Sequence, residues 1–99
     1  MRNVSLVLLF AAAAVRADST FKSNCAACHG PDGKGRVPMG KALHVKDLAS
    51  DDVQSQSDLD LKKIIAEGKG NMPAYKSKLS DDDIAALVTF IRSLRPAKP

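Results

Sequence analysis

The sequence predicts an all-α fold of three main helices, with short helices and loops between them. One observation is an apolar stripe at helical spacing near the C-terminus, in segment 84–94. Another is a middle segment, 57–68, in which a helix start signal and a helix stop signal stand at a suitable separation. The third is that no strand pattern surrounds the cysteine pair at 25 and 28. The 99 residues allow one domain at most.

The first seventeen residues have the layout of a secretory signal peptide. Arg2 supplies a positive charge, an almost unbroken apolar run follows, and Val15 and Ala17 suit the −3 and −1 positions of a cleavage site. The run is shorter than the about 20 apolar residues of a spanning helix, so a retained tether is only the alternative. We therefore expect residues 1–17 to be cleaved and residues 18–99 to form an exported domain that does not span a membrane.

The first helix of that domain is expected to begin near residue 18 and to run into the cysteine pair. Phe21, Cys25 and Cys28 are four and three residues apart, so they share one face of a helix. The Gly-Pro-Asp-Gly sequence at 30–33 then ends the helix and turns the chain.

Two helices are expected in the middle of the chain. A weaker helical pattern covers Lys41 to Leu48. A clearer helix has Ser57 as its N-cap, Asp60 at the third position of its first turn, and Gly68 as its stop signal. Its apolar stripe consists of Leu61, Ile64 and Ile65.

The last helix is the best-defined element of the sequence. Ser80 is its N-cap, acidic residues fill its first turn, and Arg92 and Arg95 lie near its end, where each charge matches the helix dipole. Pro96 ends it. One continuous stripe contains Ile84, Leu87, Val88, Ile91 and Leu94, with Phe90 at its edge.

The charge pattern and the short chain restrict the possible partners. The formal net charge of +4 falls to +2 once Arg2 and Arg16 leave with the signal. Basic residues are interleaved with Asp, which argues against a nucleic-acid partner, although those between Lys34 and Lys46 form a candidate patch for steering a protein. A short chain with few aromatic residues buries a modest core, so we expect a cofactor to add apolar bulk.

Residues 25–29 read Cys-Ala-Ala-Cys-His, the C-x-x-C-H spacing typical of c-type haem attachment. In that interpretation Cys25 and Cys28 form thioethers with one porphyrin, and His29 is the proximal ligand of its iron, so one haem c is predicted. A redox-active C-x-x-C, which belongs in a βαβ context, and a zinc site, which needs four ligands, remain alternatives. The chain has only two Cys and two His, and His44 is not at zinc-finger spacing.

Methionine as a second axial ligand gives a six-coordinate electron-transfer centre with a raised potential. Met72 is the better candidate, because it lies in an irregular Gly-rich loop before Pro73 and far enough past His29 for the chain to pass round a porphyrin. Met39 would have to turn back sharply, and core packing is the alternative for either methionine. His44 is interpreted as a surface residue, because two ligands are already assigned.

Four segments together resemble a small bacterial class I cytochrome c of the c6, c551 or c552 type. They are Cys-Ala-Ala-Cys-His-Gly at 25–30, Asp-Gly-Lys-Gly at 32–35, Gly-Asn-Met-Pro-Ala-Tyr at 70–75, and Leu-Ser-Asp at 79–81. The resemblance covers essentially the whole mature chain. It implies the class I cytochrome c fold wrapped around one covalent haem, and a periplasmic location, because this family attaches haem outside the bacterial cytoplasm.

The resemblance implies three further roles beyond the thioether cysteines and the two iron ligands. Phe21 and Phe90 match aromatic residues of the first and last helices, which lie against each other in that family. Pro38 is similar to the proline whose carbonyl accepts the ring N–H of the proximal histidine and so fixes its orientation. A plain loop proline is the alternative.

The expected function is that of a monomeric, non-enzymatic, single-electron carrier. It would shuttle electrons between respiratory or dehydrogenase complexes, with donor and acceptor proteins as its partners and no nucleic acid. Alternatives are a haem subunit docked in an oxidase or dehydrogenase, a haem sensor, a peroxidase-like enzyme with a weak or absent methionine bond, and a thiol oxidoreductase.

Overall fold

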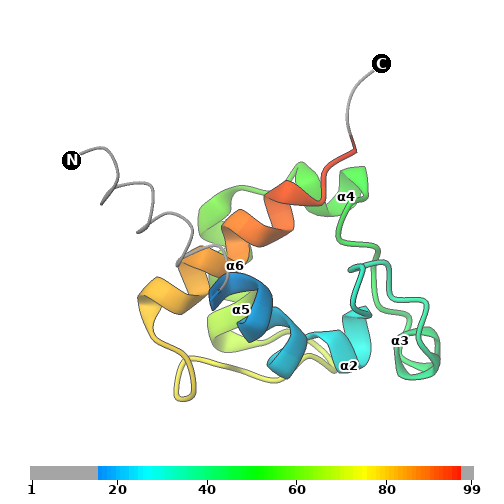
Figure 1. The fold of residues 1–99 in the computed structure, drawn as a ribbon, viewed down its shortest axis with the longest axis horizontal. Helices are drawn as coiled ribbons and strands as arrows, with labels where there is room; N and C mark the ends of the chain where they lie inside the picture. The colour runs from blue at the N-terminus through cyan, green and yellow to red at the C-terminus, as the bar shows by residue number, and fades with distance from the viewer. Residues whose placement is uncertain (1–15, 97–99) are drawn as a thin grey trace, which may run out of the picture.

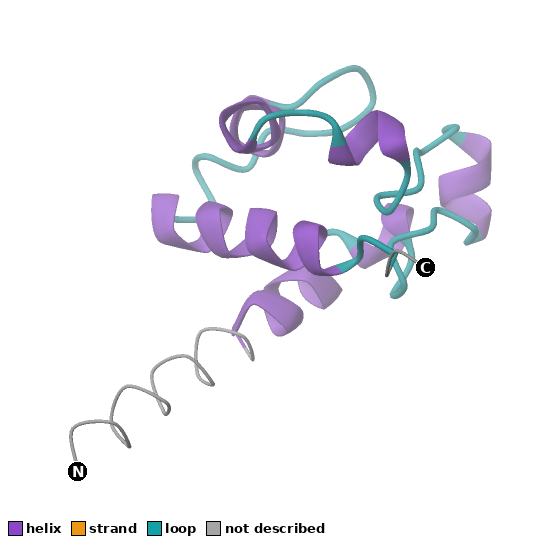
Figure 2. Cartoon of the chain, turned by 90° about the horizontal axis from the view of Figure 1, so that it is seen from above, coloured by secondary structure: helices purple, strands orange, loops and turns teal. Residues whose placement is uncertain are grey.

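The computed structural model describes residues 16–96, and within them it is built of helices and loops (Figure 2). Most of the predicted signal peptide lies outside the described residues, so the division at residue 17 stays a prediction. The helices are a first helix of residues 16–24, then α2 (Ala26–His29), α3 (Pro38–Ala42), α4 (Asp51–Gln54), α5 (Asp58–Glu67) and α6 (Asp81–Ser93). The β-type pairing in this part of the chain is an isolated bridge between Lys69 and Met72. The predicted all-α class is confirmed.

The two long helices begin where the sequence places their caps. The Ser57 hydroxyl accepts a hydrogen bond from the amide of Asp60 at 3.0 Å, which starts α5. Ser80 and Asp83 exchange side-chain and backbone hydrogen bonds at the start of α6, forming a complete capping box. Gly68 ends α5 with a φ of 78°, a conformation that glycine adopts without steric cost.

The weak helix predicted over Lys41 to Leu48 is present but lies earlier in the chain. Helix α3 begins at Pro38, whose ring holds φ near the helical value and whose missing N–H is not needed at the first position. It is over by His44, which has a φ of 55°, outside the right-handed helical region. The short α4 follows after a loop.

The core forms where the first helix, α5 and α6 meet. Phe21 and Leu87 are fully buried, and the rings of Phe21 and Phe90 lie 4.5 Å apart between centroids at 36°. The first helix (blue) therefore crosses α6 (orange), as Figures 1 and 2 show from two sides. The predicted packing of these two helices is confirmed. The other buried members of the core are Leu48, Val53, Leu61, Ile65, Ile84, Val88 and Ile91.

Arg92 ties the middle of the chain to α6. Its guanidinium donates hydrogen bonds to the carbonyls of Gln54 and Gln56 and to the carboxylate of Asp58. These bonds fix the turn between α4 and α5 against the last helix. None of the helices within residues 16–96 has both the length and the hydropathy needed to cross a bilayer.

Candidate cofactor site

The four predicted site residues line the same cavity. This cavity has a volume of about 290 Å³, and its wall includes Cys25, Cys28, His29 and Met72. Much of the remaining wall is apolar and comes from the core, including Leu48, Val53, Leu61, Ile64, Ile65, Leu87 and Ile91. The fold thus brings together residues from the two halves of the chain around one mainly apolar space.

The cysteine segment is held by short-range backbone hydrogen bonds. The first helix ends before Cys25, whose amide still donates to the carbonyl of Phe21 at 2.8 Å. The amide of His29 donates to the carbonyl of Cys25 at 2.9 Å, so both thiols and the imidazole belong to about one turn. Gly35 then donates to the carbonyl of His29 at 2.7 Å, which closes the loop that follows.

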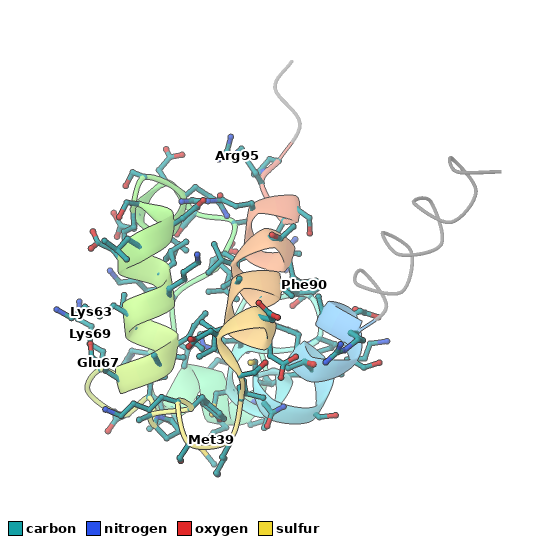
Figure 3. The ribbon with its side chains drawn as sticks, turned by 90° about the vertical axis from the view of Figure 1, so that its left-hand side faces the viewer. Met39, Lys63, Glu67, Lys69, Phe90 and Arg95 are labelled. Carbon is teal, nitrogen blue, oxygen red and sulfur yellow. The ribbon has the colours of Figure 1, made fainter. Side chains whose placement is uncertain are left out.

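Helix α3 lies directly against this segment because Gly40 has no side chain. A Cβ at Gly40 would collide with the carbonyl oxygens of Cys28 and Gly35. Met39, its neighbour, is 53% exposed and lies at the edge of the molecule (Figure 3). It does not line the cavity. The arrangement disfavours Met39 as an iron ligand.

His29 is half-buried, and its Nδ1 atom is buried without a hydrogen-bond partner. The expected bond from this ring to the carbonyl of Pro38 is therefore absent. Pro38 is the first residue of α3, so its carbonyl belongs to the helical hydrogen-bonding pattern. Burial lowers the pKa of His29, which keeps the ring neutral and able to ligate a metal at neutral pH.

The cysteines are both free thiols. Burial raises the pKa of Cys25 to about 11. Reactive C-x-x-C thiols of oxidoreductases have lowered pKa values, because the thiolate is the nucleophile. The environment of Cys25 therefore argues against the thiol oxidoreductase alternative.

The Met72 loop is a tight two-residue turn. Lys69 and Met72 exchange backbone hydrogen bonds of 2.9 and 3.1 Å across Gly70 and Asn71. Gly70 has a φ of 57°, as the first central residue of such a turn requires. The backbone at Gly68 lies close to the backbone at Met72, because a Cβ at Gly68 would lie 2.6 Å from the carbonyl oxygen of Met72.

These residues fit a covalent haem. The cavity offers a mainly apolar wall for a porphyrin, two free thiols one turn apart, a neutral half-buried imidazole and a half-buried thioether. Imidazole together with thioether is one of the standard axial ligand pairs of haem iron.

Comparison with known proteins identifies the family. The family model described as "Cytochrome C oxidase, cbb3-type, subunit III" matches residues 12–91. Cytochrome c6 of Leptolyngbya boryana is 35% identical over 74 residues, covering 72% of this chain and 80% of the relative. The chain belongs to the class I cytochrome c family.

Two further relatives of this cytochrome differ in size. The cbb3-type cytochrome c oxidase subunit FixPc of Rhizobium leguminosarum is 38% identical over 79 residues, which cover 75% of the chain but only 25% of that subunit. The chain thus spans about a quarter of the oxidase subunit that it matches. A solved structure, the KustC0563 c-type cytochrome, superposes with a TM-score of 0.75 at 28% identity, covering 81% of this chain and 98% of that one. Membership of this family implies that the cytochrome carries covalently bound haem c.

Two residues at this site had no role assigned from the sequence. His44, interpreted as a surface residue, is exposed but also lines the cavity. Tyr75 lines it too, and its hydroxyl donates a hydrogen bond of 2.9 Å to the carbonyl of Asn24. Burial, with the Cys25 and Cys28 thiols as smaller causes, raises the pKa of Tyr75, so the hydroxyl remains a donor at neutral pH. The sequence signal for Tyr75 was its place three residues after Met72.

Proposed function

We propose that this cytochrome is a periplasmic single-electron carrier. In this proposal Cys25 and Cys28 hold the haem by thioethers, and His29 and Met72 are the axial ligands of its iron. The observation that supports it best is that Met72 lines the same cavity as Cys25, Cys28 and His29, although it lies more than forty residues further along the chain.

The chain's own residues would tune the centre in three ways. The haem supplies a one-electron iron couple. His29 contributes a neutral imidazole, since burial lowers its pKa. The soft thioether of Met72 favours ferrous iron, and the mainly apolar wall disfavours the extra positive charge of the oxidised centre. The expected result is a raised reduction potential, suited to taking one electron from a donor and passing it to an acceptor.

The ligand assignment is tested by replacing Met72 with Ala in the holoprotein. We expect the near-infrared sulfur-to-iron band to disappear and the reduction potential to fall. Met39→Ala is the matched control and should leave both the band and the potential as in the parent. If Met72→Ala kept the parent spectrum, Met72 would not be the ligand.

The attachment and the export are tested by the mass of the purified periplasmic protein. We expect residues 18–99 plus one haem, and haem that stays with the chain through acid–acetone extraction. A colourless product with two alkylatable thiols would contradict the proposal.

A basic rim, defined as His44, Lys46 and Lys69, is proposed to guide donor and acceptor proteins to the cavity. Among the described residues that line the cavity, Lys46 and Lys69 carry full charges and none is acidic. Lys46 lies 3.6 Å from Asp52, but both side chains are exposed and such pairs are weak. Lys69 lies at the outer edge beyond α5 (Figure 3). A partner with an acidic docking face fits this rim best.

The docking proposal is tested by electron-transfer rates across ionic strength. Lys69→Gln is expected to slow the bimolecular rate a few-fold at low salt and to flatten its salt dependence. Lys22→Gln removes the same charge from the first helix, away from the cavity, and is expected to have a smaller effect. Rates that ignore salt would remove the steering role.

A docked subunit is the second candidate function, favoured by the match to cbb3-type oxidase subunit III. A free carrier exchanges between partners, whereas a subunit stays in a stable complex. Size-exclusion chromatography of gently lysed periplasm at physiological salt distinguishes them. We expect the cytochrome to elute as a monomer, and co-elution with a respiratory complex would favour the subunit.

No enzymatic turnover is proposed, because His29 and Met72 would fill both axial positions. Peroxidase activity is therefore expected to be at background level in the parent and to rise in Met72→Ala. High peroxidase activity in the parent would favour the peroxidase-like alternative.

A further inference from the structure

Tyr75 contacts three separate parts of the fold. Its amide donates to the carbonyls of Ile65 and Ala66, at 3.1 and 3.2 Å, where α5 ends. Its carbonyl accepts hydrogen bonds of 2.9 Å from the amides of Lys78 and Leu79 in the turn that precedes α6. Its side chain points the other way, along the cavity to the carbonyl of Asn24.

The carbonyl of Asn24, which accepts the hydrogen bond from the Tyr75 hydroxyl, lies at the end of the first helix. Asn24 is the last residue of the first helix, where carbonyls lack an intrahelical partner, and Cys25 follows it directly. Asn24 is itself held, because its side-chain amide donates to the carbonyl of Thr20 at 3.0 Å. The bond therefore ends on a fixed point beside the first thioether position.

The Met72 loop packs against the core, but it makes few other hydrogen bonds to the N-terminal half. The bridge between Lys69 and Met72 is local to the loop, and the amides of Tyr75 and Lys76 attach it to α5. Within residues 16–96, the hydrogen bond from Tyr75 to Asn24 is the one that joins segment 68–79 to segment 16–50. It connects positions 51 apart in sequence.

We propose that Tyr75 is a positioning residue for Met72: its hydroxyl holds segment 72–75 against the Cys25 segment and so keeps the Met72 thioether at the cavity. This inference rests on the proposed function, in which Met72 is an iron ligand. Met72 and Tyr75 are three positions apart, so loss of the hydroxyl bond releases the short segment between them from the Cys25 segment, while the amide of Tyr75 still holds it to α5. The ring of Tyr75 stays in place through its packing and through Lys78, whose Nζ lies 5.7 Å from the ring centroid.

The hydroxyl alone is removed in Tyr75→Phe, which keeps the ring. The experiment uses the oxidised holoprotein and titrates it with imidazole, which competes with Met72 for the iron and is followed by loss of the near-infrared band. A neutral hydrogen bond that must open before Met72 leaves predicts roughly 2- to 12-fold tighter apparent imidazole binding in Tyr75→Phe. The reduction potential is expected to fall in the same variant, because methionine ligation stabilises ferrous iron.

Phe90→Leu is the control for a merely structural effect. It loosens the contact with Phe21 and lowers global stability, but Phe90 does not line the cavity. We expect its imidazole affinity to stay within about 1.5-fold of the parent, a change below that expected for one lost hydrogen bond. Unchanged affinity in Tyr75→Phe, or an equal increase in both variants, would overturn the positioning role.

The same titration separates failure of this inference from failure of the proposed function. If the parent lacked the near-infrared band, Met72 would not be the ligand and the proposed function would be wrong. If the parent had the band and Tyr75→Phe behaved like the parent, only the role of Tyr75 would be wrong.

Discussion

The two segments that face each other across the cavity are built in different ways. The segment with Cys25, Cys28 and His29 is helical, and its hydrogen bonds join residues three to six positions apart. The segment with Met72 is a turn followed by irregular chain, and its hydrogen bond to the opposite segment runs from Tyr75 to Asn24. One segment is organised locally and the other depends on the rest of the fold.

Because of this difference, we expect the two segments to respond differently to substitutions. Local hydrogen bonds survive when distant packing is weakened, whereas a loop held by a few long-range contacts opens at lower free energy than the core. Changes near the cysteine segment should therefore appear mainly in global stability. Changes near Met72 should appear mainly in ligation.

The largest effect is expected from Phe21→Ala, which removes a fully buried ring stacked on Phe90. The lost burial and the remaining cavity predict a fall of about 3–5 kcal/mol in the free energy of unfolding of the holoprotein, measured by denaturant titration. Leu59→Ala is the control, because Leu59 is 75% exposed and a surface change should stay within about 0.5 kcal/mol. Equal effects of the two variants would contradict the observed packing of the first helix on α6.

The helix ends and the cysteine segment could be predicted from the sequence because local chemistry determines them. Ser57, Ser80 and Gly68 act through neighbours within four residues. The four candidate site residues were predicted from the C-x-x-C-H spacing and from a Gly-rich methionine loop, which are local patterns.

The contacts between residues far apart in the sequence could not be predicted, because no local sequence pattern indicates them. Arg92 was assigned to the dipole of its own helix, yet its guanidinium bonds to Gln54, Gln56 and Asp58, more than thirty positions away. The link from Tyr75 to Asn24 spans 51 positions and was missed for the same reason. The helix predicted over Lys41 to Leu48 begins earlier in the structure, because Pro38 is a favourable first residue for a helix.

An intermediate effect is expected from Gly40→Ala, on the cysteine side of the cavity. The added Cβ would meet the backbone oxygens of Cys28 and Gly35. Because these are backbone atoms, the clash can be relieved only if α3 and the segments that carry these oxygens move apart. Such overpacking predicts a loss of about 1–3 kcal/mol in unfolding free energy. Ala42→Ser, on an exposed position of the same helix, should change the same quantity by less than about 0.5 kcal/mol. A stable Gly40→Ala variant would show that α3 is free to shift away from Cys28.

The smallest effect on stability is expected from Gly70→Ala, on the methionine side. Nothing lies within 4 Å of a Cβ built there, so the cost comes only from the φ of 57° and amounts to about 1 kcal/mol. Because the strain is confined to the turn before Met72, it should weaken the near-infrared band more than it lowers global stability. Gly70→Asn should restore much of the band, since Asn tolerates this conformation better than Ala. A Gly70→Ala variant with an intact band and reduced global stability would mean that the Met72 loop and the core unfold together, and the contrast between the two segments would fail.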